Sequence, residues 1–307
     1  MSSPPVVHLV DAYVYVFRSY YSMPPMHAPD GTPVHAAHGF AATLLRMLGE
    51  LAPTHIACAF DFAMTSFRND LFSTYKAGRT EAPEDLEPQF EICEAISRAL
   101  GIPGLAAEGF EADDVIATAA EAVLAGDGAV VVVSSDKDLT QLVREDGRVA
   151  VLDFARATRF DADGVRARFG VSPAQIPDYL ALVGDSVDNL PGVSGIGPGT
   201  AARILAAFGS LEKIPTGGDA WQAAGIRGAK RLAESFAASR DQALRVRELA
   251  LLRRDAPGAT LPLDAFAWHG PDASRVAELF GRLGWKGLAG RVASLAANPG
   301  PETDTPR

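Results

Sequence analysis

The chain has 307 residues, of which 48% are hydrophobic and 21% charged, so its composition is that of a globular protein. No apolar run reaches the roughly 18 residues that a membrane span needs, and the N-terminus lacks the basic and apolar regions of a signal peptide. The net charge of -10 argues against a nucleic-acid partner, provided that the acidic residues are spread evenly.

Short apolar runs alternate with helical patterns along the first half of the chain. Strands are expected at residues 6–10, 55–60, 102–106 and 129–133. Helices are expected at residues 35–51 and 85–100, after residue 111, and from about Leu139. Continuous apolar strands separated by helices indicate an α/β protein with a mostly parallel sheet covered on both faces.

Three of the expected strands end in aspartate: Asp11, Asp61 and Asp136, the last with Asp138. One aspartate after a strand is usually a turn or helix-capping residue. Ligands of parallel sheets bind outside the carboxyl ends of the strands, so three such residues would crowd like charges into one crevice. A fold tolerates that crowding when hard divalent cations such as Mg²⁺ bind there.

A second acidic group, Glu111, Asp113 and Asp114, stands at the start of the helix that follows residue 111. The residues alone leave two interpretations open. The helix dipole favours acids in a first turn whatever their function. The same three side chains are also suited to bind metal beside the strand ends.

From about residue 171 the pattern changes to helices and turns, with helices expected at 176–183 and 201–208. Asp185 and Asp188 lie near the end of the first of these helices. The glycine-rich residues 192–200 lead into the second, and they predict either a plain turn or a hairpin whose backbone N–H groups bind phosphate. They are not a dinucleotide-binding loop, because no strand precedes them.

Basic residues gather in two places. In residues 66–80 they alternate with aromatic side chains. The second group runs from Arg227 through Lys230 and Arg231 to Arg254, and its interpretation as a solvated helix face stays open. Amphipathic helices are expected within 271–295, and the proline-rich residues 298–307 are expected to be disordered. Cys58 and Cys93 lie in apolar segments and are expected to be reduced core residues, as in a cytoplasmic protein.

Taken together, these features resemble the bacterial 5′-nuclease family, which comprises the N-terminal nuclease domain of DNA polymerase I and its stand-alone relatives and is related to flap endonucleases. The resemblance covers about residues 6–295. It is carried by Leu-Val-Asp11, Phe-Asp61, Phe-Arg68, Tyr75-Lys76-Ala-Gly-Arg79, Glu111-Ala-Asp113-Asp114-Val, Asp136-Lys-Asp138-Leu, Gly184-Asp185-Ser-Val-Asp188-Asn-Leu-Pro-Gly and Gly195-Ile-Gly197.

The resemblance implies a PIN-like, three-layer α/β/α catalytic domain at residues 1–170, with a helical arch at about 66–85. A DNA-binding subdomain of the helix-hairpin-helix type would follow at 171–260. A helical segment at 261–296 and a tail at 297–307 complete the expected organisation.

The resemblance also implies two divalent ions, Mg²⁺ or Mn²⁺. One site would use Asp11, Asp61, Glu111, Asp113 and Asp114, and the other Asp136, Asp138, Asp185 and Asp188. Setting these nine aside leaves 29 acidic against 28 basic residues, so the remaining surface need not repel DNA. Such a pair of ions activates water and stabilises the charge that develops in phosphodiester hydrolysis. None of the six histidines groups with these acids, and none is expected to be catalytic.

For DNA, the resemblance implies phosphate contacts from Lys76 and Arg79, a clamp or structural role for Arg68, a place beside the active site for Arg18 and base stacking on Tyr75. The hairpin would grip duplex phosphates without reading sequence, often through a bound K⁺ at Val193 and Ile196. Its residues are Gly192, Val193, Gly195, Ile196, Gly197 and Thr200. Relatives often carry lysine where this chain has Ser194 and Gly199, so we expect weaker binding of duplex DNA.

The function so implied is a monomeric, structure-specific 5′ nuclease of the cytoplasm and nucleoid, without polymerase activity. It would act on DNA with 5′ flaps, nicks or free 5′ ends, and on RNA–DNA primers. Two alternatives remain: a junction-binding or flap-binding protein with little nuclease activity, and a small ribonuclease of the same sheet type. The hairpin opposes the second alternative.

Overall fold

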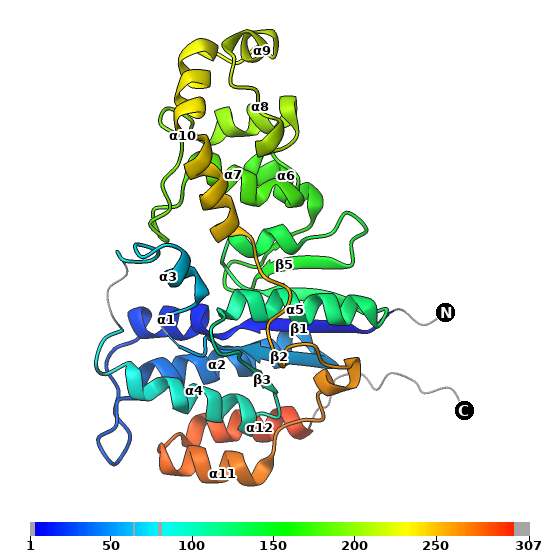
Figure 1. Ribbon diagram of the computed structural model, residues 1–307. Coiled ribbons are helices and arrows are strands. Elements are labelled where there is room, and N and C mark those ends of the chain that lie inside the picture. The colour runs from blue at the N-terminus through cyan, green and yellow to red at the C-terminus, as the bar shows by residue number, and fades with distance from the viewer. Residues whose placement is uncertain (1–3, 64, 79–81, 298–307) are drawn as a thin grey trace. The chain divides into compact units, whose positions relative to one another are not determined.

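The computed structural model describes residues 4–63, 65–78 and 82–297, which form two compact units (Figure 1). The first unit comprises Met1–Phe62, Glu81–Ser135 and Asp255–Arg307, and the second comprises Ala63–Thr80 and Asp136–Arg254. Both units are therefore built from segments that are distant in the sequence.

The first unit contains four parallel strands in the order β3-β2-β1-β4. The strands are β1 (Val6–Asp11), β2 (His55–Ala59), β3 (Gly104–Leu105) and β4 (Ala129–Val133). The central strand β1 pairs Leu9 with Ala57 of β2 and with Val132 of β4. Leu9 is only 1% exposed, so the sheet is covered on both faces, as its continuous apolar strands predict.

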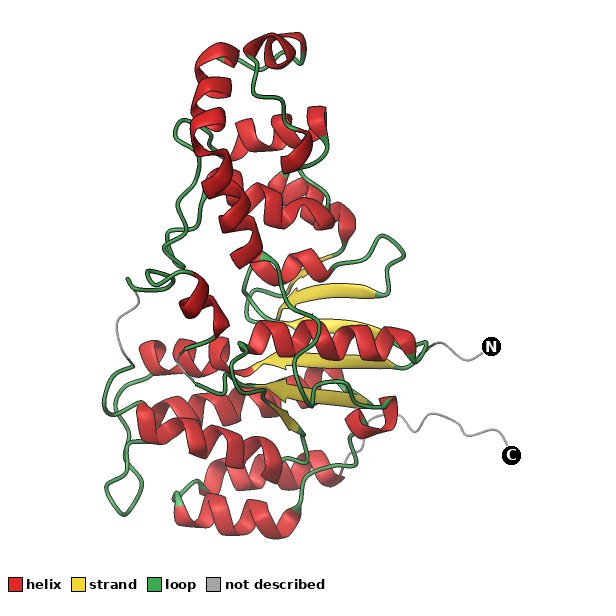
Figure 2. Cartoon of the chain, viewed as in Figure 1, coloured by secondary structure: helices red, strands yellow, loops and turns green. Residues whose placement is uncertain are grey.

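Helices cover the two faces of this sheet (Figure 2). They are α1 (Ala12–Ser22), α2 (His35–Leu51), α4 (Glu87–Ala99) and α5 (Ala112–Ala125). The unit also contains α11 (Ala273–Arg282), α12 (Lys286–Ala297) and a short 3-10 helix, η4 (Leu263–Phe266). The chain moves from β1 to β2 to β3 and then returns across the sheet to β4. Right-handed crossovers therefore place α1, α2 and α4 on one face and α5 on the other. The expected three-layer α/β/α arrangement with a mostly parallel sheet is confirmed in this unit.

Close packing of α1 on α2 fixes the layer that follows β1. A Cβ at Gly39 of α2 would lie 2.6 Å from the Cβ of Ser19 on α1, so only glycine fits there. α11 packs against α4, and α12 packs against α2. The C-terminal helices thus belong to the same compact unit as the sheet.

The second unit is mainly helical. It contains α3 (Phe67–Leu71), α6 (Ala162–Phe169), α7 (Ile176–Val183), α8 (Pro198–Phe208), α9 (Gly218–Ala223) and α10 (Ala229–Ala250). The 3-10 helices are η1 (Asp138–Leu142), η2 (Pro173–Gln175) and η3 (Leu211–Lys213). An antiparallel pair, β5 (Val149–Asp153) and β6 (Thr158–Phe160), completes it. The long α10 packs on α7 and α9, around a fully buried Trp221 that contacts Phe208 and Phe236. The expected helical subdomain, with α7 and α8 joined by the glycine-rich segment, is confirmed.

Two local features differ from the sequence-based expectation. The helix expected from about Leu139 is only the short 3-10 helix η1, because Asp146-Gly147 soon turns the chain and Gly147 adopts a φ of 76°. The β5–β6 pair was not expected. Cys58 and Cys93 are both buried and form no disulfide, as expected. Among the residues that the structure describes, no helix combines the length and apolarity needed to cross a membrane.

Candidate functional site

The carboxyl end of β1 places Asp11 at the edge of the parallel sheet of the first unit. Asp11 is 5% exposed, and its Oδ2 accepts a hydrogen bond of 2.7 Å from the hydroxyl of Ser134, which directly follows β4. The chain runs from β1 outward to β2 and β3 and then returns through α5 to β4 on the other side of β1, so the order of connections reverses between β1 and β4. Neighbouring strands with this property open a crevice at their carboxyl ends, which is the usual ligand site of such sheets.

Asp61, Glu111 and Asp114 meet at the first turn of α5. Asp61 Oδ1 accepts a hydrogen bond of 2.7 Å from the backbone N–H of Ala112. Glu111 and Asp114 form a capping box, in which each side chain accepts from the other residue's backbone N–H. Asp114 is fully buried, while Asp113 is half-buried in the same turn. The helix dipole and these N–H donors therefore stabilise several of the acids that the sequence assigns to the first metal site.

In the second unit, Asp138, Asp185 and Asp188 converge. One carboxylate oxygen from each lies within 4.8 Å of the other two, and the three residues are 9%, 6% and 8% exposed. Asp138 comes from the start of η1, and the other two come from the loop that follows α7. Within the described part of the chain, the five acids of the first unit form no comparable three-oxygen group.

The ammonium group of Lys137 balances part of this negative charge. It contacts Asp185 Oδ2 directly and lies 3.3 Å from Asp138 Oδ1. Burial lowers the pKa of Lys137, but Asp138 and Asp185 outweigh that effect and raise it above its ordinary value. Burial, together with Asp136, Asp185 and Asp188, raises the pKa of Asp138 to about 7 despite the lysine beside it. One ammonium group therefore does not neutralise the three carboxylates.

The donor set fits a hard divalent cation. Asp138 Oδ1 is buried and accepts no hydrogen bond from the described residues, so its one contact with a cation is the long one to Lys137. Carboxylate oxygens grouped in this way are the ligands that Mg²⁺ and Mn²⁺ prefer. Asp136, the fourth acid of the predicted site, instead accepts a hydrogen bond of 2.8 Å from the backbone N–H of Asp138, so it shapes the turn that presents Asp138.

The segment before Arg79 is anchored on the loop that carries these acids. Lys76 N–H donates to the Asp188 carbonyl at 3.0 Å, and Asn189 Nδ2 donates to the Thr74 carbonyl at 2.8 Å. The Tyr75 hydroxyl donates to Asp188 Oδ2 at 3.4 Å, and Tyr75 as a whole is only 4% exposed. The Lys76 ammonium lies 5.0 Å from the centre of the Tyr75 ring. This burial leaves little ring surface for stacking on a base and favours a role for Tyr75 in orienting Asp188.

The remaining predicted DNA-binding residues differ in exposure. Arg68 is 1% exposed and donates from Nε to the Leu249 carbonyl at 2.7 Å and from Nη2 to the Leu251 carbonyl at 3.0 Å. Of the two predicted roles, these bonds favour structural support over a clamp on DNA phosphates. Arg18 is exposed on α1. Arg79 lies outside the described residues.

The hairpin between α7 and α8 has the backbone geometry that its glycines predict. A Cβ at Gly192 would lie 2.3 Å from the Val183 carbonyl oxygen, and Gly195 has a φ of 82°. Val193 and Ile196 are buried, and the N–H of Ile196 donates to the Val193 carbonyl at 3.0 Å. Gly197 is exposed at the N-cap of α8, and Thr200 lies in its first turn. The segment is therefore a rigid turn that presents backbone groups at a helix start.

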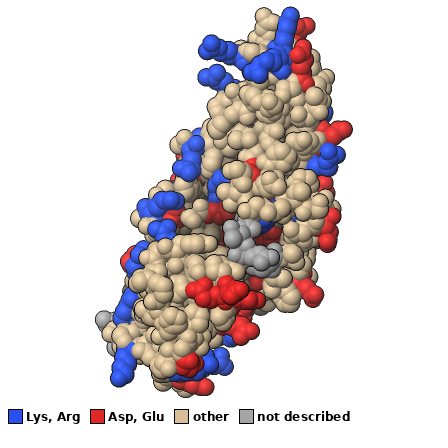
Figure 3. All heavy atoms as spheres, turned by 90° about the vertical axis from the view of Figure 1, so that its left-hand side faces the viewer, with Lys and Arg blue, Asp and Glu red and all other residues tan. Residues whose placement is uncertain are grey.

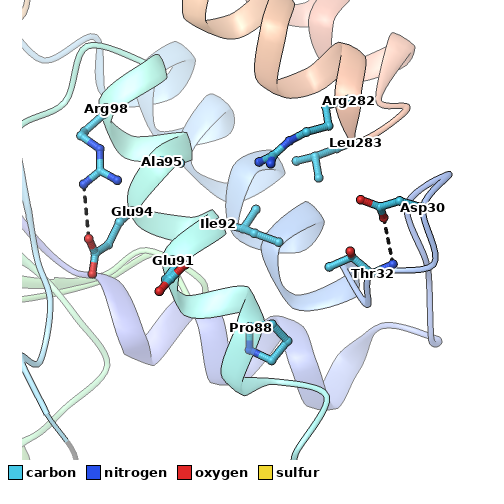
Figure 4. Close-up of a pocket in the computed structure, with 10 residues that line it drawn as sticks. All are labelled: Asp30, Thr32, Pro88, Glu91, Ile92, Glu94, Ala95, Arg98, Arg282 and Leu283. Carbon is cyan, nitrogen blue, oxygen red and sulfur yellow. Dashed lines mark hydrogen bonds and ion pairs between the residues drawn. The ribbon is translucent and has the colours of Figure 1, made fainter.

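A hollow of about 530 Å³ in the first unit lies between α4, the loop before α2 and the end of α11 (Figure 4). Its charged groups are partly paired: Arg98 contacts Glu94 at 3.3 Å, and Asp30 accepts from the Thr32 N–H at 3.0 Å. None of the predicted site residues lines it.

Sequence reasoning missed Lys137 and Ser134 as partners of the acids. Lys137 stands between two of the predicted ligands, Asp136 and Asp138, which was the available signal. Ser134 directly follows the strongest predicted strand, but serine is common after strands and gave no comparable signal.

Two family models match the chain. One, described as "5'-3' exonuclease, N-terminal resolvase-like domain", matches residues 6–170. The other, described as "5'-3' exonuclease, C-terminal SAM fold", matches residues 171–274. The two matches are contiguous and together cover most of the chain.

Similar proteins include longer and shorter relatives. The chain is 40% identical over 263 residues to DNA polymerase I of Pseudomonas aeruginosa, an alignment that covers 83% of this chain and 28% of that protein. It is 39% identical over 208 residues to the 5'-3' exonuclease of Aquifex aeolicus, which covers 68% of this chain and 71% of that protein. The chain thus spans about a third or less of the polymerases that it matches and most of the shorter exonuclease.

Among solved structures, the chain is similar to the bacteriophage T5 flap endonuclease in a complex with DNA and metal ions. The TM-score is 0.63 at 18% sequence identity, over 95% of this chain and 99% of the phage protein. A likeness at this level of identity establishes the shared fold.

Proposed function

The chain belongs to the 5'-3' exonuclease family, and from that premise we propose that it is a metal-dependent, structure-specific 5′ nuclease acting on DNA. The observation that carries the proposal is the convergence of Asp138, Asp185 and Asp188. Lys137 offsets only part of their combined negative charge. A fold that merely bound DNA phosphates would gain nothing from three carboxylates gathered there, because like charges repel the backbone.

We assign the two predicted acid sets to two divalent ions, Mg²⁺ or Mn²⁺. Such ions, when bound, supply activation of water and stabilisation of the charge on the phosphodiester. Asp138, Asp185 and Asp188 would hold one ion, and the acids at the carboxyl edge of the first unit's sheet, Asp11 and the α5 group, would hold the other. Tyr75 and the tight loop at Asp185 orient the ligands of the second set.

We assign substrate contacts to the basic residues that the fold leaves accessible. Lys76, half-buried beside Tyr75, would bind a phosphate next to the bond that is cut. Arg79 is proposed for the same role on the basis of the sequence. Arg18 is exposed on α1 and would be accessible to DNA. Arg68 would instead stabilise the fold through its hydrogen bonds to the backbone.

The hairpin supports binding of duplex DNA independently of sequence. Its glycines leave the backbone at Gly197 and Gly199 open, since nothing lies within 4 Å of a Cβ built at either position. We propose that K⁺ is held through the backbone near Val193 and Ile196, because both side chains are buried. Substrates with 5′ flaps, nicks, free 5′ ends or RNA–DNA primers fit such a protein, which would act as a monomer on DNA in the cytoplasm.

The test is cleavage of a duplex with a labelled 5′ flap, with Mg²⁺, with Mn²⁺ and with a chelator. We expect product with either ion and none with the chelator. Asp138→Asn should remove cleavage and keep DNA binding, while Asp163→Asn, which neutralises an exposed acid on α6, should change neither. Binding of the flap with no product in either ion would refute the nuclease and support the flap-binding alternative.

A further inference from the structure

The hairpin that is proposed to grip duplex DNA carries no positive charge of its own. Residues 191–200 contain neither lysine nor arginine. A backbone turn alone offers N–H donors but no cation to replace the counterions of DNA, and counterion release supplies most of the affinity for a duplex. A basic side chain for this surface would have to come from another segment of the chain.

Helix α10 supplies one. A Cβ at Gly195 would lie 3.2 Å from Nη1 and 3.4 Å from Nη2 of Arg231, so the guanidinium group rests against the turn of the hairpin. The side chain of Leu232 packs at the same glycine, and the hydroxyl of Ser235 donates to the Ser194 carbonyl at 2.8 Å. The start of α10 and the hairpin are therefore held together by three separate contacts.

Glycine at position 195 favours this arrangement. Its φ of 82° lies in the left-handed region, where other residues are strained, and a side chain there would push the guanidinium group back by a few tenths of an ångström. The close approach of Arg231 thus depends on both the conformation and the small size of this residue.

Arg231 has exposed basic neighbours on the same end of the unit. Arg227 and Lys230 are both exposed, and the stem of Lys230 packs over Gly218 of α9. Lys230 and Arg231 also line a hollow of about 450 Å³ at the start of α10. Figure 3 shows Lys and Arg side chains gathered over the end of this unit where α9 and the start of α10 lie.

The three basic side chains near the hairpin form no ion pairs with carboxylates of the described residues. Within the described residues, neither Arg227, Lys230 nor Arg231 lies within 4.0 Å of a carboxylate oxygen, although Glu234 follows on the next turn of α10. In contrast, Arg247 of the same helix contacts both Glu212 and Asp178. The basic residues near the hairpin are thus available to phosphates, while one farther along α10 serves the fold.

We propose that Arg231, with Arg227 and Lys230, forms the cationic half of the duplex-binding surface whose other half is the hairpin. The guanidinium group of Arg231 would bind a backbone phosphate beside the N–H groups at Gly197, and its two flanking residues would contact neighbouring phosphates. This inference rests on the proposed function, because it takes its partner, duplex DNA, from it.

The experiment measures binding of a labelled blunt duplex over a range of KCl concentrations, with a chelator present so that no cleavage occurs. Arg231→Gln should flatten the plot of log affinity against log salt by about 0.9, the value for one lost phosphate contact. Arg231→Lys should retain most of the slope. Arg245→Gln is the matched control, since it removes one exposed charge from the same helix four turns away and should leave the slope unchanged.

A gain of charge in the hairpin provides a second, independent readout. Gly199→Lys has room for its side chain and should restore the lost slope in the Arg231→Gln protein. Equal slopes for the parent and Arg231→Gln, or a parent that does not bind the duplex at low salt, would overturn the inference. Failure of the nuclease proposal is a separate result: it appears as absence of flap cleavage with metal, whatever the slopes are.

Discussion

The two groups of acids in this protein are held in different ways. In the first unit, Asp11 accepts from Ser134, Asp61 accepts from the start of α5, and Asp114 belongs to a capping box. In the second unit, Asp138 and Asp185 face each other across the ammonium group of Lys137. The helix dipole and backbone hydrogen bonds therefore stabilise most of the first group, whereas in the second group the buried Asp138 Oδ1 accepts no hydrogen bond from the residues that the structure describes and has Lys137 to offset its charge.

This difference separates two costs of building a metal site. Acids that cap a helix remain stable as anions without an ion, so their substitution should harm both the fold and the chemistry. Acids that mainly repel one another destabilise the folded protein. Their substitution should therefore lower the cleavage rate more than it lowers the free energy of unfolding. The predictions below test this contrast.

The largest expected effect is on cleavage. Asp114→Asn and Asp185→Asn each remove one negative charge with little change in shape, one in each group. We expect either change to lower the single-turnover cleavage rate of a 5′ flap roughly 10²–10⁴-fold, the range for losing a directly acting group. DNA affinity measured with a chelator should be kept.

The contrast would break if only one of the two changes mattered. Cleavage that survives Asp114→Asn would reduce the first group to a helix cap and leave the second as the whole metal centre. Asp163→Asn, an exposed acid on α6 paired with Arg166, controls for a general effect of lost charge.

The next effect is on stability. Asp61→Ala removes the acceptor of the Ala112 N–H and should lower the free energy of unfolding by about 1 kcal/mol, as for other lost helix caps. Urea unfolding without divalent ions measures this. Glu108→Ala removes an exposed acid shortly before α5 and should cost little. Equal losses would show that the hydrogen bond of Asp61 contributes nothing particular to the fold.

Lys137→Gln tests the second group by taking away its own cation. Without divalent ions, the three carboxylates should then repel more strongly, and the free energy of unfolding should fall by about 1 kcal/mol. Added Mg²⁺ should stabilise Lys137→Gln more than the parent protein, because the ion then no longer competes with an ammonium group. Thermal melts with and without Mg²⁺ measure both effects, and an equal Mg²⁺ shift in the two proteins would exclude that competition.

Much of the fold could be predicted from local patterns. The helix at 35–51 and the strands around Leu9 and Val131 were expected because β-branched or periodic apolar residues were continuous and ended at clear breakers. The β5–β6 pair was not expected. Its strands are short, and the 158–160 segment is largely exposed, so its residues lack a clear apolar alternation.

The candidate site was predictable in its residue types but not in its contacts. Asp138, Asp185 and Asp188 were grouped from their motifs, and the structure brings these three together. The contact of Lys137 with Asp185 and the burial of Arg68 depend on tertiary packing. No sequence spacing reports such packing, because these partners are up to 183 residues apart.

The smallest expected effect concerns Tyr75. Its hydroxyl donates to Asp188 over 3.4 Å, which is a long hydrogen bond. Tyr75→Phe should therefore raise the activation free energy of cleavage by only about 0.4–1 kcal/mol, because Asp188 loses one orienting contact. The cleavage rate should then fall about two- to fivefold at unchanged DNA affinity. Tyr20→Phe is the matched control, since that hydroxyl donates to Asp85, which belongs to neither acid group. The opposite result, weaker binding of flaps with an unchanged rate, would mean that the Tyr75 ring leaves its buried place to stack on a base. In that case Asp188 would be oriented by its backbone alone, through the Lys76 N–H that its carbonyl accepts.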